Sequence, residues 1–185
     1  MRKLFLIRHA QPEVTPGVPP RLWPLTVQGH EGAQQLAQHL AGSDQPVRLY
    51  ASPELKAQET AQRIGHHLNL PIETVAGLRE HDREHTPFLG KEAWENTLIA
   101  FFSRPTELIF GEESAHQALQ RFNAVVEKIV ADAPKGNLAL VTHGTVLTLF
   151  VASHNPQIDA LAFWRSLQLP DLIVLTLPDF RLDNR

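Results

Sequence analysis

Two kinds of hydrophobic pattern alternate along the chain. Short continuous apolar runs are typical of strands buried on both faces, and apolar residues at intervals of three and four are typical of helices with one buried face. The runs cover residues 3–8, 47–51, 71–75, 138–142 and 172–177. Strands that alternate with helices in this way predict an α/β fold with a largely parallel sheet.

Three of the predicted helices begin after a residue type that caps helices well. Thr26, Ser52 and Ser114 are each followed by apolar residues at helical spacing. Further helices are expected over residues 94–102 and after Gly144. The inner faces of the first three are predicted to carry Ala33, Leu36, Ala37, Leu40 and Ala41; Ala57, Ala61, Ile64 and Leu68; and Leu119, Phe122, Val126, Ile129 and Ala133.

Three segments are expected to lie at the margins of this core. Five prolines between Pro12 and Pro24 predict a stiff irregular loop. The highly charged segment 80–90 is expected to be an exposed loop. The last apolar run, 172–177, is expected to be an edge strand that either pairs across a homodimer or is covered within the monomer.

The composition fits one globular domain over residues 1–185, with 43% hydrophobic and 20% charged residues. The net charge of −3 gives no reason to expect nucleic acid or an anionic membrane as partner. The chain has no cysteine, which excludes disulfides, thiolate metal sites and a cysteine nucleophile. The apolar run after Lys3 is too short for a signal peptide or a membrane span, so we expect a cytoplasmic protein.

Two of the predicted strands end in a histidine. Arg8 and His9 follow the first run, and His143-Gly144 follows the run that ends at Thr142. Ligands bind at the carboxyl ends of the strands in open α/β sheets. Two histidines and an arginine delivered to this edge therefore indicate an anion site with a potential nucleophile.

Five stretches of the sequence resemble motifs of the histidine phosphatase superfamily, the phosphoglycerate mutase-like proteins. They occur in the family's order over most of the chain, from Lys3 to about Val151, and five motifs in order are far more specific than one. The stretches are Arg8-His9-Ala10-Gln11, Leu25-Thr26-Val27-Gln28-Gly29, the segment from Ala51 to Ala61, Leu78-Arg79-Glu80, and Thr142-His143-Gly144.

This resemblance implies a three-layer α/β/α fold with a mostly parallel central sheet, and a role for each matching residue. His9 is expected to attack phosphorus and to carry the phosphoryl group as phosphohistidine, with its other ring nitrogen fixed by a backbone carbonyl. Arg8 and His143 are expected to bind phosphate oxygens, and Glu80 to act as general acid and base. Gln11 and Thr145 are expected to line the pocket. The resemblance implies neither a metal nor another cofactor, because the cationic side chains would supply the positive charge.

The chain departs from the family pattern at two of these positions. Lys56 stands where the pattern has its second phosphate-binding arginine, which keeps the charge but loses the planar fork of the guanidinium. Arg21 in the proline-rich loop is the more plausible compensating residue and Arg63 the less plausible one; the alternative is that Lys56 faces solvent. Ala10 replaces the usual glycine and adds a methyl group close to the expected phosphate position.

The sequence therefore predicts a phosphatase that acts on a small phosphorylated metabolite, with two alternatives left open. One is a phosphoglycerate mutase-type phosphoryl transferase, which the short chain and the proline-rich loop disfavour. The other is a catalytically weak protein that binds phosphorylated ligands, which the presence of lysine at position 56 keeps open.

A metal site on His81 and His85, with Asp82 and Glu84 between them, is a rival interpretation of the charged loop. The aromatic residues either line the pocket or belong to the core: Trp23, Trp94, Phe101 and Phe102.

Overall fold

The computed structural model describes residues 1–42, 44–87, 89–133 and 135–183. Every strand and helix expected from the hydrophobic pattern is present, with small shifts at the ends. The strands are β1 (Lys3–Arg8), β2 (Pro46–Ala51), β3 (Ile72–Thr74), β4 (Asn137–Thr142), β5 (Asp171–Thr176) and β6 (Arg181–Leu182). The helices are η1 (Pro20–Leu22), α1 (Val27–Leu40), α2 (Leu55–Leu68), η2 (Ala76–Leu78), α3 (Lys91–Ser103), α4 (Ala115–Asp132), α5 (Gly144–His154) and α6 (Ala160–Ser166).

The strands form one mixed sheet in the order β3-β2-β4-β1-β5-β6. β3, β2, β4 and β1 are parallel, whereas β5 runs antiparallel to β1, and β6 antiparallel to β5. The expectation that residues 172–177 form an edge strand is wrong. β5 pairs with β1 along its length, and Leu175 and Thr176 pair with β6 on its other side. The short strand after the turn at residues 177–180 therefore covers part of β5 within the same chain.

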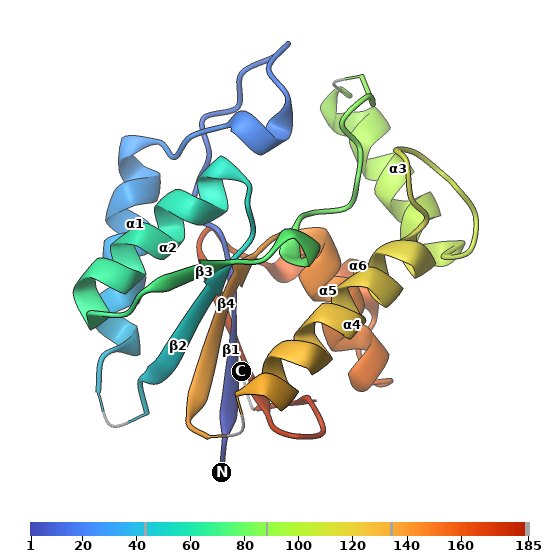
Figure 1. The fold of residues 1–185 in the computed structure, drawn as a ribbon. Helices are drawn as coiled ribbons and strands as arrows, with labels where there is room; N and C mark the ends of the chain where they lie inside the picture. Colours follow the sequence, from blue (N-terminus) through green and yellow to red (C-terminus); the bar gives the residue numbers. More distant parts are fainter. Residues whose placement is uncertain (43, 88, 134, 184–185) are drawn as a thin grey trace.

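The sheet separates two hydrophobic layers, because successive strand residues point to opposite faces. In β1, Phe5 and Ile7 pack with α1 and α2, whereas Leu4 and Leu6 pack with α4 and α5. Figure 1 shows α1 and α2 on one side of the sheet, with α4 and α5 on the other. Leu4, Leu6 and Ile7 are fully buried, and each such side chain stabilises the fold by roughly 1.5–3 kcal/mol. The three-layer α/β/α architecture is thus confirmed.

Two of the three predicted helix caps are confirmed, and one is wrong. Thr26 caps α1, because its hydroxyl accepts a hydrogen bond from the N–H of Gly29. Ser114 caps α4 in a reciprocal pair with Gln117. Ser52 does not cap α2, which begins only at Leu55. The Ser52 hydroxyl instead lies 2.7 Å from the ring of His143, so this residue belongs to the site rather than to the helix end.

The helices that follow the neighbouring parallel strands β1 and β4 cover opposite faces of the sheet. β1 leads into α1 on one face, whereas the neighbouring β4 leads directly into α5 on the other face. Helices that leave two adjacent strands in opposite directions open a crevice at the strand ends, which is the usual ligand position in such sheets. Arg8 and His9 end β1 and His143 follows β4 at this point.

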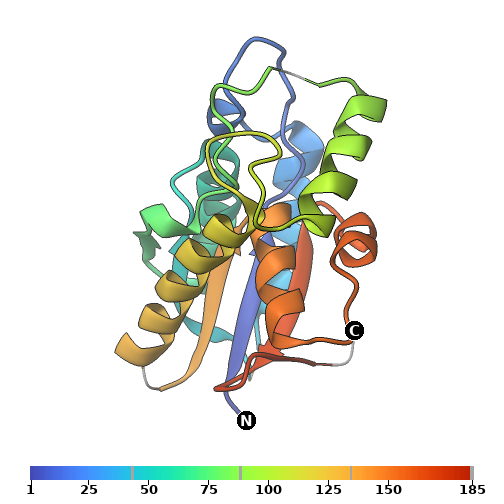
Figure 2. The same cartoon turned by 90° about the vertical axis from the view of Figure 1, so that its right-hand side faces the viewer.

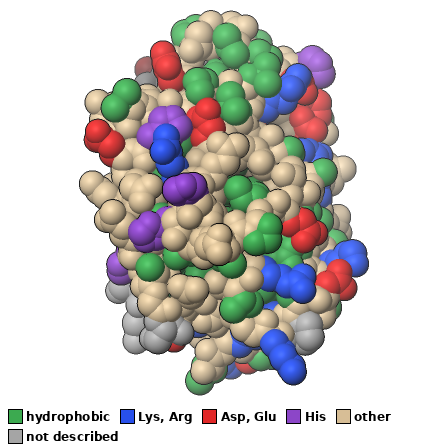
Figure 3. Space-filling model, turned by 60° about the vertical axis from the view of Figure 1, so that its left-hand side comes forward, with side chains coloured by type: hydrophobic (Ala, Val, Ile, Leu, Met, Phe, Trp, Pro, Cys, Tyr) green, Lys and Arg blue, Asp and Glu red, His purple; other side chains and the backbone are tan. Residues whose placement is uncertain are grey.

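Two loops and α3 rise above this crevice. Figure 1 shows residues 10–24 on one side, and residues 81–87 with α3 on the other. Figure 2 shows that these segments lie at the end opposite the N-terminus. Hydrophobic side chains gather at the same end of the molecule in Figure 3. Val14, Val18 and Leu22 of the proline-rich loop are among the exposed ones. The region above the strand ends is therefore more apolar than its surroundings.

Within the described residues, no helix is both long and apolar enough to cross a membrane.

Candidate active site

Backbone hydrogen bonds hold the two strand ends together. The N–H of His9 donates to the carbonyl of Thr142 at 3.0 Å, which links the end of β1 to the end of β4. The N–H of Ala10 donates to the hydroxyl of Thr60 on α2 at 3.0 Å, and that hydroxyl donates to the carbonyl of Lys56. Three elements distant in sequence are thereby fixed around the His9 backbone.

The ring of His9 has a defined tautomer. Its Nδ1 lies 2.8 Å from the carbonyl oxygen of Ala10. A carbonyl can only accept, so Nδ1 carries the proton and Nε2 keeps its lone pair when the ring is neutral. Burial, with help from His143 and Lys56, lowers the pKa of His9 well below its ordinary value of 6.5. The ring is therefore neutral near pH 7, the state that a nucleophile requires.

His143 lies beside His9 and is fully buried. The two ring centroids are 5.2 Å apart. His143 Nε2 lies 2.7 Å from the Ser52 hydroxyl and 3.4 Å from Oε1 of Glu54. Burial, followed by the charge of Lys56, lowers the pKa of His143 well below 6.5. Its Nδ1 is buried and has no partner among the described residues.

The Arg8 guanidinium lies beside the end of α6. One of its nitrogens donates to the carbonyl of Leu167 at 3.0 Å, and the group lies 6.0 Å from the ring centroid of Trp164. The Nε atom is buried without a partner among the residues described. A side chain at position 144 would place its Cβ 3.1 Å from this Nε. Glycine at position 144 therefore lets Arg8 approach the start of α5.

Lys56 is buried, with 5% of its surface exposed, which contradicts the alternative that it faces solvent. Its ammonium group donates to the carbonyl of Pro20 at 2.8 Å and forms an ion pair with Glu54. Burial lowers the pKa of Lys56, and Glu54 opposes this shift. Glu54 was not foreseen from the sequence. Its second oxygen accepts the backbone N–H of Glu80 at 2.8 Å, so one carboxylate joins Lys56, His143 and the loop of Glu80.

The carboxylate of Glu80 accepts three backbone hydrogen bonds. They come from His81 at 2.9 Å and from Thr145 and Val146 at 3.1 Å. The last two are free N–H groups in the first turn of α5, where the helix dipole also favours a negative charge. Burial disfavours the ionised form, but His143, Arg83 and these N–H groups outweigh it and lower the pKa of Glu80 to about 2.

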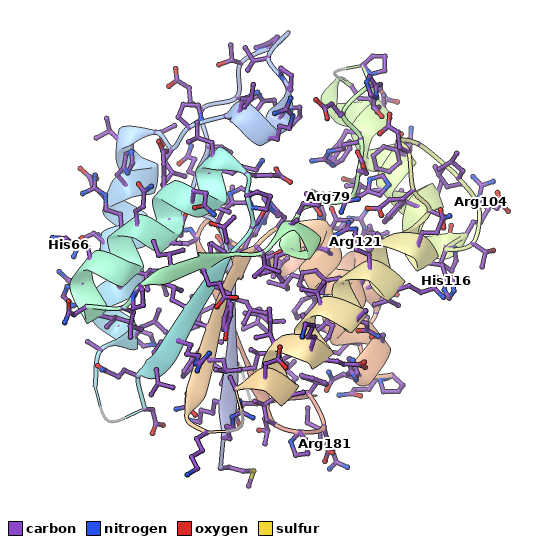
Figure 4. All side chains as sticks on the ribbon, viewed as in Figure 1. His66, Arg79, Arg104, His116, Arg121 and Arg181 are labelled. Atoms are coloured by element: carbon purple, nitrogen blue, oxygen red, sulfur yellow. The ribbon has the colours of Figure 1, made fainter. Side chains whose placement is uncertain are left out.

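The loop that carries Glu80 is held from α4. The Arg121 guanidinium donates to the carbonyls of Gly77 at 2.8 Å and of Arg79 and Glu80 at 3.1 Å. It also pairs with Glu113, whose carboxylate accepts the N–H of Asp82. Figure 4 shows Arg79 and Arg121 where η2 meets α4. Arg121 thus holds the backbone around Glu80 in place.

A cavity of about 480 Å³ opens above His9. All three tryptophans of the chain line it, which sequence inspection left undecided for Trp23 and Trp94 and did not foresee for Trp164. Phe101, by contrast, is core. The lining residues at the end of β1 and at the starts of α2 and α5, which we call the floor, are mostly polar, and most of the other lining residues are apolar. The lining residues are Arg8, His9, Pro12, Val14, Pro20, Trp23, Lys56, Glu80, Arg83, Thr86, Pro87, Leu89, Trp94, Gly144, Thr145, Trp164 and Leu169.

Five predicted positions are absent from the residues that line this cavity. His143 is one of them, because its ring is fully buried. Gln11 contributes its carbonyl, which accepts the N–H of Thr26, and its side chain is not among the lining residues. Arg21 lines an adjoining cavity and pairs with Glu84 at 2.8 Å. Arg63 lies on the exposed surface of α2 beside His30 of α1 and cannot compensate for Lys56. The buried Ala10 packs with Leu25 and Ala33 and is not among the lining residues, so its methyl group does not narrow the cavity.

The rival metal site is not assembled. His81 is buried against Phe101 and Phe110, and its Nε2 contacts the carbonyl of Glu113 at 2.6 Å. The His85 side chain is largely exposed and turns to Glu112. In the part of the chain that the structure describes, no group of three or more potential ligands is arranged to hold a metal ion.

The buried titratable groups predict acid sensitivity. The pKa values of three histidines are lowered in the folded state: His9, His81 and His143. Below pH 6.5 the unfolded chain therefore binds more protons than the folded chain. Each histidine then lowers the free energy of unfolding by up to about 1.4 kcal/mol per pH unit. Glu80, with a pKa lowered from 4.5 to about 2, adds stability above pH 4.5 that is lost as the pH falls toward 2. We expect the melting temperature to be constant from pH 8 to 7 and to fall progressively below 6.5. A constant melting temperature between pH 7 and 5 would contradict the burial of these neutral rings.

The sequence and the fold resemble those of known phosphatases. The family model of the histidine phosphatase superfamily (branch 1) matches residues 4–180. A mycobacterial glucosyl-3-phosphoglycerate phosphatase complexed with VO3 has a TM-score of 0.79 and 21% identity, covering 100% of this chain and 99% of that one. The α-ribazole phosphatase from Shigella flexneri has a TM-score of 0.77 and 20% identity, covering 99% and 94%. A phosphoserine phosphatase mutant from Entamoeba histolytica, in complex with phosphoserine, has a TM-score of 0.77 and 17% identity, covering 99% and 94%.

The structural neighbours share the fold at low sequence identity, and a comparison with curated protein sequences gives no match. The family model spans nearly the whole described chain, including both strand-end histidines and Glu80. The motifs, the three-layer fold and the family model agree. This chain belongs to the histidine phosphatase superfamily.

Proposed function

We propose that this protein is a phosphatase that hydrolyses phosphate monoesters through a phosphohistidine on His9. The observation that carries this proposal is the neutral His9 ring, with Nδ1–H bound to the Ala10 carbonyl and Nε2 left as a nucleophile on the floor of the cavity. Arg8, Lys56 and Arg83 also line that cavity, and cations around the attacking nitrogen suit a phosphoryl group.

In the proposed first step, the lone pair of Nε2 attacks phosphorus, the N–P bond forms and the bond from phosphorus to the ester oxygen breaks. Arg8 Nε and His143 Nδ1, both buried and unpaired within the described chain, are the donors we assign to phosphate oxygens. For the neutral His143 ring this assignment requires that Nδ1 carries the proton and that Nε2 accepts from the Ser52 hydroxyl. In the second step, water attacks the phosphohistidine, inorganic phosphate leaves, and His9 regains its lone pair. The reaction needs no group beyond water and these side chains.

The proton for the leaving oxygen is assigned to Glu80. In the ligand-free protein its low pKa keeps it ionised, so it cannot enter the reaction already protonated. A phosphate ester that binds as a monoanion brings one proton and a like charge, and a like charge beside a carboxylate raises its pKa. Glu80 would take this proton and pass it to the ester oxygen, and then remove a proton from the attacking water.

A second candidate function is tight binding of a phosphorylated ligand with weak turnover. The observation that favours it is the ion pair of Lys56 with Glu54, which engages the ammonium group and brings a negative charge into the site. A mutase would use the same phosphohistidine but would pass the phosphoryl group to a second hydroxyl instead of water.

One screen separates these functions. Purified protein is incubated with a panel of phosphorylated metabolites and with p-nitrophenyl phosphate, and both phosphate release and thermal shift are measured for each compound. We expect phosphate release from at least one ester, inhibited by vanadate. A thermal shift without release identifies a binding protein. Transfer of label to an acceptor hydroxyl without release identifies a mutase, and neither signal with any compound would refute the proposal.

A further inference from the structure

We propose that Arg83 supplies the planar phosphate-binding contact that lysine at position 56 cannot make. This inference rests on the proposed function and adds a residue to it. Arg83 follows Glu80 by three positions, in the loop that closes the side of the cavity. No sequence motif singles it out, since it is one of several charged residues in a row.

The position of Arg83 at the cavity supports this role. Arg83 lines both the cavity above His9 and the adjoining cavity of about 490 Å³ beside Arg21. The two cavities share Pro20, Glu80 and Arg83 as lining residues. Its charge also acts on two groups that the proposed reaction uses, because it lowers the pKa of both Glu80 and His143. The guanidinium is therefore close to the reacting groups and not merely at the rim.

The contacts of Arg83 leave its hydrogen-bonding edge available. The guanidinium carbon lies 4.6 Å from the ring centroid of Trp94, within the range of a cation–π contact, which orients a guanidinium without using its N–H donors. Its Nη1 is buried and has no partner in the described part of the chain. Leaving a buried donor unpaired destabilises the folded protein. A phosphate oxygen in the cavity would satisfy it.

Lys56 by itself is poorly placed for the second contact. Two donor directions of its ammonium group are already used, one toward the Pro20 carbonyl and one toward Glu54. An ammonium also binds phosphate as a point charge and cannot make two parallel hydrogen bonds. The pair of Lys56 and Glu54 has no net charge, so Arg8 and Arg83 supply most of the positive charge of the cavity, and both interact with the Glu80 carboxylate.

The test uses three variants at position 83. Arg83→Met retains an apolar side chain over Trp94 but removes the charge, Arg83→Lys restores the charge without the fork, and Arg83→Ala removes both. Arg79→Ala is the matched control, because Arg79 lies in the same loop, is half-buried, pairs with Asp82 and does not line the cavity above His9. Melting temperatures and circular dichroism show whether each variant is folded. The vanadate inhibition constant, the affinity for inorganic phosphate by calorimetry, and kcat/KM are then measured.

We expect Arg83→Met and Arg83→Ala to weaken vanadate and phosphate binding about tenfold or more and to lower kcat/KM about 10²-fold, the usual effect of losing one directed donor. Arg83→Lys should recover part of both, and Arg79→Ala should stay within about twofold of the wild type. Adding Lys56→Arg to Arg83→Met should restore part of the lost affinity, because the new fork stands in the other half of the site.

A spectroscopic measurement adds a readout independent of turnover. Phosphate that engages Arg83 should change the fluorescence of Trp94, so titration with inorganic phosphate should alter emission in the wild type and much less in Trp94→Phe or Arg83→Met. A folded Arg83→Met variant with wild-type affinity and kcat/KM would overturn the assignment of Arg83 while leaving the phosphatase intact. A wild-type protein that neither binds phosphate nor hydrolyses any ester would instead refute the proposed function.

Discussion

Replacing His9 with alanine is expected to lower turnover of phosphate esters by about 10⁴-fold or more, the order seen when a covalent nucleophile is removed. The physical reason is the tautomer of His9, which leaves Nε2 unprotonated on the cavity floor. Neighbouring groups cannot replace it, because the Nε2 of His143 contacts Ser52 and Glu54 and its ring is fully buried. Phosphate binding should survive in the variant, since Arg8 and Arg83 remain.

The measurement combines steady-state kinetics with rapid acid-free quenching of a radiolabelled ester. Wild-type protein should carry label that is stable in base and labile in acid, and the His9→Ala variant should carry none. His66→Ala is the control, because His66 is an exposed residue on α2, far from the strand ends (Figure 4). A His9→Ala variant with more than a few per cent of wild-type turnover would mean that another residue forms the covalent intermediate.

Replacing Glu80 with glutamine is expected to lower kcat by about 10²–10⁴-fold, the usual contribution of a positioned proton donor. The loss should depend on the leaving group. An alkoxide needs a proton as it departs, whereas p-nitrophenolate does not, so alkyl phosphates should lose far more activity than p-nitrophenyl phosphate. Vanadate affinity should change little, because the variant keeps every cation of the site.

The glutamine variant also has a structural cost that must be measured separately. The Glu80 carboxylate accepts from His81, Thr145 and Val146, and an amide has only one oxygen to offer them. Its NH₂ would face an N–H donor, which should lower the stability by about 1–3 kcal/mol. Glu84→Gln, at an exposed residue of the same loop, is the control for loop changes. Equal losses with alkyl and aryl esters would show that Glu80 positions the loop and is not the proton donor.

The sequence by itself determined the fold class and which residues meet at the ends of the parallel strands, because those depend on local patterns. Apolar runs placed the strands, and helical spacing with Thr26 and Ser114 placed the starts of α1 and α4. The carboxyl ends of parallel strands meet at one edge, so Arg8, His9 and His143 converge wherever the sheet is parallel. The chemistry of a strand end is encoded in the residues next to it, which the sequence shows directly.

The tertiary structure decided everything that depends on contacts between distant segments. Ser52 is adjacent to a helix, yet its hydroxyl meets His143, 91 residues away along the chain. The sequence of residues 172–177 is typical of an edge strand, but in the structure the short β6 pairs with part of it. Arg83 is one charge among many in the sequence, and only its packing on Trp94 beside His9 and Glu80 distinguishes it. The partners of charged and hydroxyl side chains cannot be predicted from the spacing of residues along the sequence. Their interaction energies depend on which groups the folded chain brings within hydrogen-bonding distance.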